Sequence, residues 1–320
     1  MCSTLVHRRH DLLRAGPGIT AGRTSVGGLT GSKKALVVCG PTAGGKSELA
    51  DALAEGLAEN STGRGGHTPT IVVDSMQVYR ELPIITNQAR RRPAELVGIV
   101  PVTEEWTVAR HRARAEAVVR ESGTHFALDA GTGMYLNAIL LDIPLAPKVS
   151  AEHRTLAREF AEDAPNPRRA ARAKELELAG ARDPGSIWDG LPRYDATILY
   201  LRPERPALDL SISRRTAKIV GDGLDEANLI RRMLADGAPV NPSVRESVGV
   251  KELTEYLAGD LLTLDGAEDR INARTRRLAR RQMRWFDKLA RTLQARTRVR
   301  ILRGTSPMEF LNSMHDIMEA

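Results

Sequence analysis

Residues 40–47 read GPTAGGKS and match the pattern G-x-x-x-x-G-K-[ST] of a phosphate-binding loop (P-loop). The loop stands between an apolar stretch, ALVVC, and a stretch with helical spacing, ELADALAEGLAE, which is the context that the pattern requires. Its glycines let backbone N–H groups face an anion, Lys46 neutralises the anion, and the Ser47 hydroxyl can reach Mg²⁺. The sequence therefore predicts a phosphate site, but leaves open whether the phosphate belongs to ATP, GTP or another molecule.

Two aspartates at the ends of predicted strands are candidates for the chemistry beside this loop. Asp74 follows TIVV, and Asp129 ends THFALD. A P-loop enzyme that uses a nucleotide needs such a carboxylate to hold magnesium. Asp74 is followed by SMQVYREL, whose polar residues are more typical of a substrate contact than of a metal site.

The charge of the chain is positive and concentrated near the C-terminus. The 320 residues carry a formal net charge of +7, which indicates a polyanionic partner or a solvated basic surface. Between Ile271 and Arg300, ten Arg and one Lys stand against a single Asp. No apolar run is long enough for a membrane span, and two cysteines exclude a disulfide framework. We expect a cytoplasmic protein.

Isolated cysteine and histidine residues suggest no further chemistry. Cys39 lies in the first predicted strand and is expected to be a small core residue. The histidines, His111 among them, show no metal-ligand spacing and are expected at the surface or in loops.

Strands alternate with helices along most of the chain, which predicts an α/β fold, P-loop NTPase-like, with a doubly wound parallel sheet. Residues 34–144 form the first part of this core, 145–190 a small helical insert, and 191–303 the rest of the core with Arg-rich C-terminal helices. Residues 304–320 are expected to be a tail. Residues 1–33 have the composition of a disordered extension, compatible with a transit peptide or with a start codon placed too early.

Five motifs in order resemble the tRNA dimethylallyltransferase family, also called isopentenyl-diphosphate:tRNA transferases. The first three are GPTAGGKS, DSMQVYRELPIITNQ and AGTGMY. Further on, SVGVKELTEYLAGD resembles the G-Y-K-E-L block of the family, and ARTRRLARRQMRWF resembles its T-R-x-x-A-x-R-Q-x-x-W-F block. The similarity runs in pieces from about Ala35 to Asp287.

This resemblance implies that the P-loop holds the diphosphate of dimethylallyl diphosphate and that no nucleotide is hydrolysed. Asp74 would be the general base for the exocyclic N6 of an adenine, and Thr132 would lie beside the reacting centre, with Ser75, Met76 and Gln77 on the adenine side. Ser47 would also bind Mg²⁺. The diphosphate-binding residues implied by the resemblance are Gly40, Pro41, Thr42, Ala43, Gly44, Gly45, Lys46, Ser47 and Arg215.

The acceptor implied by the resemblance is an adenosine in the anticodon loop of a tRNA, extruded from its stack. RNA contacts are expected from the insert and from one Arg-rich helix, whose buried side would be formed by Leu278, Trp285 and Leu289. A solvated basic helix is the alternative that the residues alone favour. The expected RNA-contacting residues are Arg169 and Arg172 in the insert, and Arg274, Arg276, Arg277, Arg280, Arg281 and Arg284 in the helix.

Several departures from the family pattern keep other functions open. The insert after Asp142 is short, the paired histidines after the T-N-Q stretch are absent, and Asp129 and Ala130 replace an apolar residue and a glycine. A short insert occurs in relatives that prenylate free AMP, ADP or ATP. A P-loop small-molecule kinase and a non-catalytic RNA-binding relative are further alternatives. In each case we expect a monomer.

Overall fold

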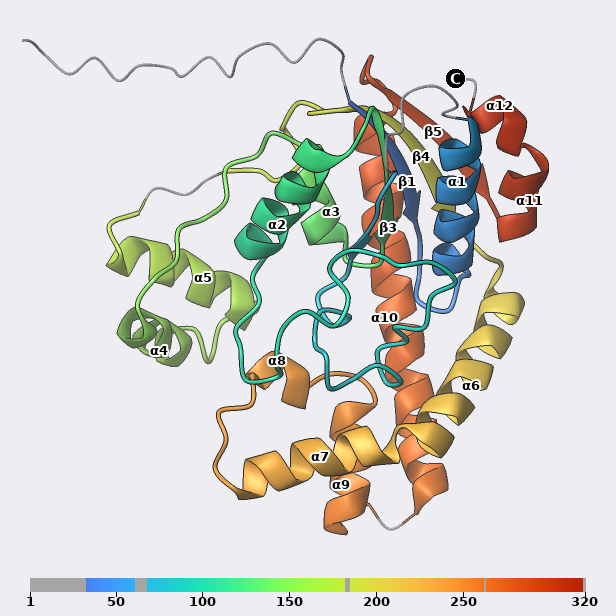
Figure 1. Cartoon of the computed structure of the whole chain (residues 1–320). Coiled ribbons are helices and arrows are strands. Elements are labelled where there is room, and N and C mark those ends of the chain that lie inside the picture. Colours follow the sequence, from blue (N-terminus) through green and yellow to red (C-terminus); the bar gives the residue numbers. More distant parts are fainter. Residues whose placement is uncertain (1–32, 61–67, 182–184, 262, 319–320) are drawn as a thin grey trace, which may run out of the picture. The chain divides into compact units, whose positions relative to one another are not determined.

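The computed structural model describes residues 33–60, 68–181, 185–261 and 263–318 (Figure 1). The prediction of a disordered extension therefore lies almost entirely outside the described residues. Among the helices that are described, none is both long enough and apolar enough to cross a membrane.

Five parallel strands form one sheet with the order β2-β3-β1-β4-β5. Strand β1, which precedes the P-loop, lies at the centre (Figure 1). The central strands are continuous apolar runs because both faces of the sheet are covered. The strands span Lys34–Cys39 (β1), Thr70–Val73 (β2), His125–Ala130 (β3), Asp195–Leu201 (β4) and Val299–Gly304 (β5).

Helices pack on both faces of this sheet, which confirms the predicted doubly wound α/β fold. Leu36 and Val38 of β1 pack in the apolar cluster on one face of the sheet, and Val37 and Cys39 pack in the cluster on the opposite face. Figure 1 shows the helices on the two faces. The first face is covered by α1 (Lys46–Asn60), α11 (Pro307–Asn312) and α12 (Met314–Met318). The second is covered by α2 (Val108–Glu121), α3 (Gly133–Leu140) and the C-terminal half of α10 (Leu264–Leu293).

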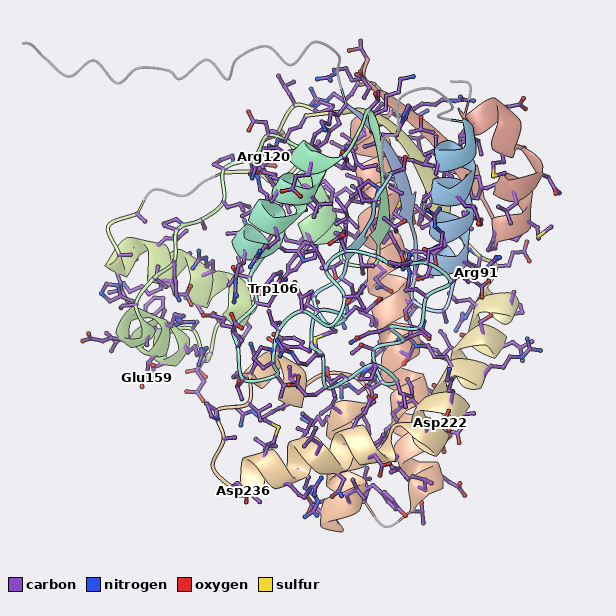
Figure 2. The ribbon with its side chains drawn as sticks, viewed as in Figure 1. Arg91, Trp106, Arg120, Glu159, Asp222 and Asp236 are labelled. Carbon is purple, nitrogen blue, oxygen red and sulfur yellow. The ribbon has the colours of Figure 1, made fainter. Side chains whose placement is uncertain are left out.

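A further apolar cluster, separate from those on the two faces of the sheet, lies beyond the carboxyl edge of the sheet. The long connection 74–107, which carries Arg91 and Trp106, contributes Val78, Tyr79 and Leu82 to it (Figure 2). Helix α10 contributes Ile271 to this cluster and Phe286 to the cluster on the second face of the sheet. It therefore connects these two clusters. The other helices on this side are α6 (Arg205–Asp222), α7 (Leu224–Ala235), α8 (Pro242–Arg245) and α9 (Val250–Ala258).

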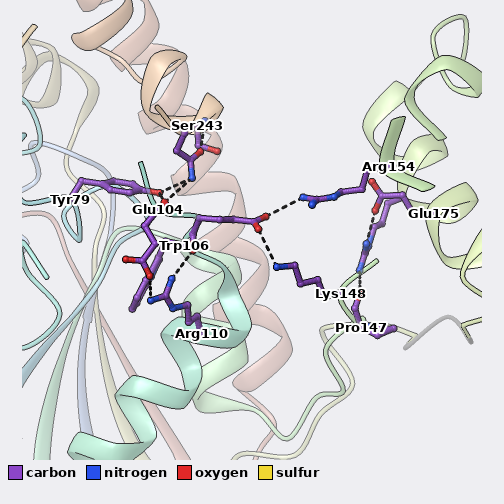
Figure 3. Close-up of polar contacts among 12 residues, drawn as sticks. Tyr79, Glu104, Trp106, Arg110, Pro147, Lys148, Arg154, Glu175 and Ser243 are labelled. Atoms are coloured by element: carbon purple, nitrogen blue, oxygen red, sulfur yellow. Dashed lines mark hydrogen bonds and ion pairs between the residues drawn. The ribbon is translucent and has the colours of Figure 1, made fainter. Parts of the chain in front are cut away.

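In the region expected to be a helical insert, the structure has two helices that pack on each other, α4 (Ala151–Phe160) and α5 (Pro167–Leu178). Glu105, which precedes α2, pairs with Arg154 of α4 at 3.2 Å and with Lys148 at 3.6 Å (Figure 3). On the return of the chain, Trp188 packs against Trp285 of α10 with ring centroids 5.0 Å apart. The insert is therefore tied to the core at both of its ends.

The expectation of a tail at 304–320 is wrong for the part of it that the structure describes. Gly304 ends strand β5, and Phe310 and Ile317 are buried with α1. Helix α11 is only 6 residues long, too short for a helical period to show in the sequence. The strand before it is half-buried and carries exposed arginines, which hid it among the basic residues.

His111 is also placed differently from the expectation, because it is fully buried on α2. Its Nδ1 accepts a hydrogen bond of 3.0 Å from the indole N–H of Trp106, and the Tyr135 ring lies 4.9 Å away. Burial lowers the pKa of His111 to about 4. Cys39 is a buried core residue as predicted, and burial raises the pKa of its thiol to about 12, which excludes a nucleophilic thiolate at neutral pH.

Candidate active site

Three of the motifs meet at the carboxyl edge of the sheet. The P-loop follows β1, Asp74 follows β2, and the Gly131–Thr132 turn follows β3. These strands are parallel neighbours in the order β2-β3-β1, so their ends lie side by side although they are far apart in the chain. This is where ligands bind in open α/β sheets, as expected from the sequence.

The P-loop brings two half-buried cations together. Lys46 Nζ donates to the carbonyl of Pro41 at 2.7 Å, and Arg215 Nη1 from α6 donates to Thr42 Oγ1 at 2.7 Å. Burial lowers the pKa of both Lys46 and Arg215, because their charges are removed from water. A bound anion would stabilise both charges. The backbone of Gly45 has a φ of +81°, a left-handed conformation that favours glycine at this position.

Asp74 is half-buried and is fixed by the turn that follows it. Its Oδ1 accepts the backbone N–H groups of Met76 at 2.8 Å and Gln77 at 3.3 Å. Burial raises the pKa of Asp74, although these two hydrogen bonds and the nearby Lys46 and Arg215 oppose the rise. Its Oδ2 lies against Gly131, where an added Cβ would come within 2.7 Å. The second oxygen therefore remains beside the turn that follows β3.

Thr132 and Ser75 join that turn to the Asp74 segment. The backbone N–H of Ser75 donates to Thr132 Oγ1 at 3.1 Å. The N–H groups of both Gly131 and Thr132 donate to the carbonyl of Val73, the last residue of β2. Thr132 thus lies at the carboxyl edge of the sheet, in contact with the Asp74 segment.

Asp129 carries a second carboxylate at this edge, which is buried and forms an ion pair with an arginine. Asp129 Oδ2 accepts from Ser47 Oγ at 2.7 Å and pairs with Arg90, which also pairs with Asp51 at 2.6 Å. Arg90 lies in the segment that lacks the paired histidines of the family. The two departures from the family pattern are therefore in contact with each other. We had not singled out Arg90, because its partners are remote in the chain.

Helix α10 contributes a residue that sequence reasoning missed. Gln282 Oε1 accepts the backbone N–H of Thr42 at 2.8 Å, and Gln282 Nε2 donates to the carbonyl of Gly131 at 3.0 Å. One turn further on, Trp285 packs on Gly133 so closely that a Cβ there would overlap its ring. The signal that could have revealed this role is the RQMRW block itself, whose glutamine stands within an Arg-rich run.

Four of the eight arginines expected to contact RNA are exposed on α10, whereas others make ion pairs within the protein. Arg277, Arg280, Arg281 and Arg284 are exposed. Arg276 lies 3.4 Å from Asp209. On the buried side, Leu289 is buried as predicted, while Leu278 and Trp285 are only half-buried.

Two arginines that we expected to contact RNA are bound within the protein instead. Arg274 pairs with the buried Glu252 at 2.5 Å and donates to the carbonyl of Glu246 at 2.6 Å. Arg172 of the insert pairs with Glu175 at 2.5 Å and donates to the carbonyl of Pro147. Arg169 is exposed on the same helix, α5. Arg274 therefore belongs to the packing of α9 on α10.

A cavity of about 560 Å³ lies between α6, α10 and the end of β5. Its apolar lining includes Leu208, Ile212, Ala279 and Met283, which pack with Ala43 of the P-loop. Its charged lining has both signs, with Arg202, Arg205, Arg276, Arg280 and Arg303 beside Glu204, Asp209 and Glu309.

Comparison with known proteins identifies the family. The IPP transferase family model matches residues 77–289. A tRNA dimethylallyltransferase of Rubrobacter xylanophilus is 57% identical over 295 residues, which cover 90% of this chain and 99% of the relative. The chain belongs to the tRNA dimethylallyltransferase family. A family member from Gluconacetobacter diazotrophicus is 37% identical over 294 residues, covering 78% of this chain and 82% of its own.

Solved structures agree with this membership. The full-length tRNA isopentenylpyrophosphate transferase of Bacillus halodurans has a TM-score of 0.61 and 26% identity, and covers 90% of this chain and 97% of its own. The tRNA isopentenylpyrophosphate transferase of Staphylococcus epidermidis, at 21% identity and a TM-score of 0.61, shows the same fold. The protein is thus a prenyltransferase enzyme of the tRNA dimethylallyltransferase family, and the kinase alternative is set aside.

Proposed function

We propose that this prenyltransferase moves a dimethylallyl group from dimethylallyl diphosphate to N6 of an adenosine in a tRNA anticodon loop. The observation that carries the proposal is the position of the half-buried carboxylate of Asp74 at the same sheet edge as the half-buried cations Lys46 and Arg215. This pairing provides a proton acceptor next to an anion site, which is what attack by an amine on an allylic diphosphate requires.

The donor diphosphate fits the P-loop. Its negative charge would be held by Lys46, by Arg215 and by the N-terminus of α1, with the hydroxyls of Thr42 and Ser47 in reach. When the bond between C1 and the diphosphate oxygen breaks, the leaving group gains charge. Cations already in place stabilise that charge without reorganisation.

The residues beside Ser47 fit a Mg²⁺ ion. The Ser47 hydroxyl and the Asp129 carboxylate supply hard oxygen donors, the type that Mg²⁺ prefers, and diphosphate oxygens and water would complete its shell. Within the described ranges, no group of three His, Cys, Asp or Glu side chains could hold a metal ion without such help. When bound, Mg²⁺ would neutralise the leaving diphosphate.

The acceptor amine would be activated by Asp74. As N6 forms its bond to C1, one N6 proton passes to the carboxylate, and the electron pair of the C1–O bond leaves with the diphosphate. The raised pKa of Asp74 makes it a stronger base than an ordinary aspartate. Gln77 Oε1 is buried, and no described residue donates to it, so it suits the remaining N6 hydrogen, with Ser75 and Met76 beside it.

A tRNA acceptor is favoured by the exposed arginines of α10, because phosphates of a stem-loop are neutralised by such side chains. Free adenylate is the second candidate, suggested by the short insert. We expect the enzyme to act as a monomer in the cytoplasm, with Arg169 of the insert and Arg276, Arg277, Arg280 and Arg281 of α10 on the RNA side.

Purified enzyme, dimethylallyl diphosphate and Mg²⁺ should be incubated in parallel with an anticodon stem-loop and with AMP, ADP or ATP at low salt. Mass spectrometry of the nucleosides should reveal N6-dimethylallyladenosine in the stem-loop. Ready prenylation of a free adenylate, with the stem-loop left unmodified, would contradict the tRNA assignment.

A further inference from the structure

We infer that Gln282 is a positioning residue that holds the diphosphate loop in register with the turn beside the catalytic base. This inference rests on the proposed function, because it assigns the P-loop to the donor and Asp74 to the base. The side chain lies on α10, in the part of the chain where an RNA-binding face was expected. Both ends of its amide are hydrogen-bonded to backbone groups of the site.

The amide of Gln282 bridges two loops that follow neighbouring strands. Thr42, in the loop after β1, donates its backbone N–H to Oε1, and Gly131, in the turn after β3, accepts from Nε2 with its carbonyl. The side chain of Thr42 is itself bound to Arg215. A single side chain thus sets the distance between the anion-binding loop and the turn after β3.

The Gly131 end of this bridge lies next to the base. A Cβ built on Gly131 would meet Asp74 Oδ2 at 2.7 Å and Gln282 Nε2 at 3.7 Å. Any movement of the turn that loss of the bridge allows would therefore change the space beside the carboxylate oxygen. Positioning errors of about 1 Å cost roughly 10²-fold in rate when a nucleophile and a leaving group must be aligned.

The backbone that carries Gln282 is held on both sides. Ala279, one turn before it, packs with Leu208 and Ile212 of α6, and Phe286, one turn after it, packs in the sheet cluster. Trp285 donates to Asn137 Oδ1 at 3.2 Å. Because the helix backbone is held in place, the position of the Gln282 amide relative to the two loops is also fixed.

The chemistry of the bridge requires an amide. Glutamine offers an acceptor and a donor at the same end of one side chain, and no other residue of its length does. Glutamate would keep the acceptor for Thr42 but would place a second acceptor against the carbonyl of Gly131. Methionine has a similar length and neither strong donor nor strong acceptor. The two substitutions therefore remove the bridge in different ways.

The test compares Gln282→Glu and Gln282→Met with Gln294→Glu and Gln294→Met. Gln294 is exposed at the C-cap of the same helix, so the control pair makes the same chemical changes away from the site. Four quantities should be measured for each variant: the Tm, the affinity for inorganic diphosphate with Mg²⁺, kcat for transfer to a stem-loop, and KM for that stem-loop.

We expect both Gln282 variants to bind diphosphate about tenfold more weakly and to lose about 10²-fold in kcat, with KM for the stem-loop within twofold of the native value. The acid limb of the pH profile of kcat should also move, because the carbonyl next to Asp74 is released. The Gln294 variants should match the native enzyme in all four quantities.

A lower Tm for the Gln282 variants with native diphosphate affinity and native kcat would overturn the inference, since it would leave Gln282 a packing residue only. A rise in stem-loop KM alone would overturn it as well and return Gln282 to the RNA face. Diphosphate affinity is measured without an acceptor, so this comparison tests Gln282 whatever the acceptor is. A wrong acceptor assignment would instead appear as a native enzyme that does not modify the stem-loop.

Discussion

Ser47 and Asp129 are joined by a hydrogen bond of 2.7 Å, which connects the phosphate loop to strand β3. The same carboxylate oxygen pairs with Arg90, and Arg90 pairs in turn with Asp51 of α1. All three charged side chains are nearly inaccessible to water. Because each charge is buried, the loss of any one partner would leave an uncompensated buried charge and destabilise the folded protein.

Asp129→Ala should therefore destabilise the protein by about 3 to 5 kcal/mol, since Arg90 would be left as a buried charge with one partner lost. Urea unfolding at neutral pH measures the effect. The triple variant Asp51→Asn, Arg90→Met and Asp129→Leu should recover part of the loss, because all three buried charges are removed together.

Asp222→Asn, at the exposed end of α6, is a matched control and should change the free energy of unfolding little (Figure 2). If Asp129→Ala is as stable as this control, the cluster is not the buried charge network described here.

Lys46→Ala should lower kcat on the order of 10²-fold or more, because the developing charge of the diphosphate would lose the cation that the P-loop supplies. Steady-state kinetics with a saturating stem-loop measures this effect. Lys218→Ala, which removes an exposed lysine of α6, should leave kcat unchanged. Turnover of Lys46→Ala close to that of Lys218→Ala would refute the role of Lys46 at the phosphate.

Asp74→Asn should retain donor binding and lose transfer, because the amide has the size of the carboxylate and cannot accept the N6 proton. In the native enzyme, activity needs the deprotonated carboxylate, and burial raises the pKa of Asp74. Activity should therefore fall on acidification at a pH above the ordinary aspartate pKa of about 4. A pH profile of kcat/KM measures this limb.

The two measurements on Asp74 separate a base from a metal ligand. Equal losses of turnover and of diphosphate affinity in Asp74→Asn would assign the residue to Mg²⁺ instead.

Arg277→Ala combined with Arg281→Ala should raise KM for the stem-loop, since both side chains are exposed on the helix proposed to contact phosphates. The dependence of log affinity on log salt should flatten by roughly two units, one for each lost contact. Filter binding at several salt concentrations measures the slope.

The control for this pair removes the same charge elsewhere, with Arg120→Ala on α2 and Arg300→Ala on β5 (Figure 2). An equal change of slope in both double variants would mean that the net charge of the protein, and not this face of α10, sets the affinity.

His111→Gln should remove a pH dependence of stability. Burial lowers the pKa of His111 from 6.5 to about 4. Between these two pH values the imidazole is protonated in the unfolded chain and neutral in the folded protein, so acidification favours unfolding. The stability conferred by the neutral ring is complete above about pH 6.5 and decreases by up to about 3 kcal/mol on approach to pH 4. Urea unfolding at a series of pH values should show this slope in the native protein and a weaker one in the variant. Equal slopes would contradict it.

Local features of this protein were predictable from the sequence because their causes are local. The P-loop pattern, the apolar strand before it and the helix after it lie within a few residues of one another, and the alternation of strands and helices follows from apolar periodicity. The end of a parallel strand also predicts the sheet edge at which Asp74 lies. Thr132, in the AGTGMY motif that follows strand β3, lies at the same edge for the same reason.

Only the tertiary structure decided which remote groups complete the site. Gln282 lies 240 residues from Thr42, and Arg90 lies 39 residues from both Asp51 and Asp129, so no periodicity or spacing relates them. The same holds for Arg274, whose charge is used by Glu252 and not by a ligand. Charge and polarity are properties of each residue, but whether a polar side chain faces solvent, another helix or the site depends on how α10 packs on both apolar clusters.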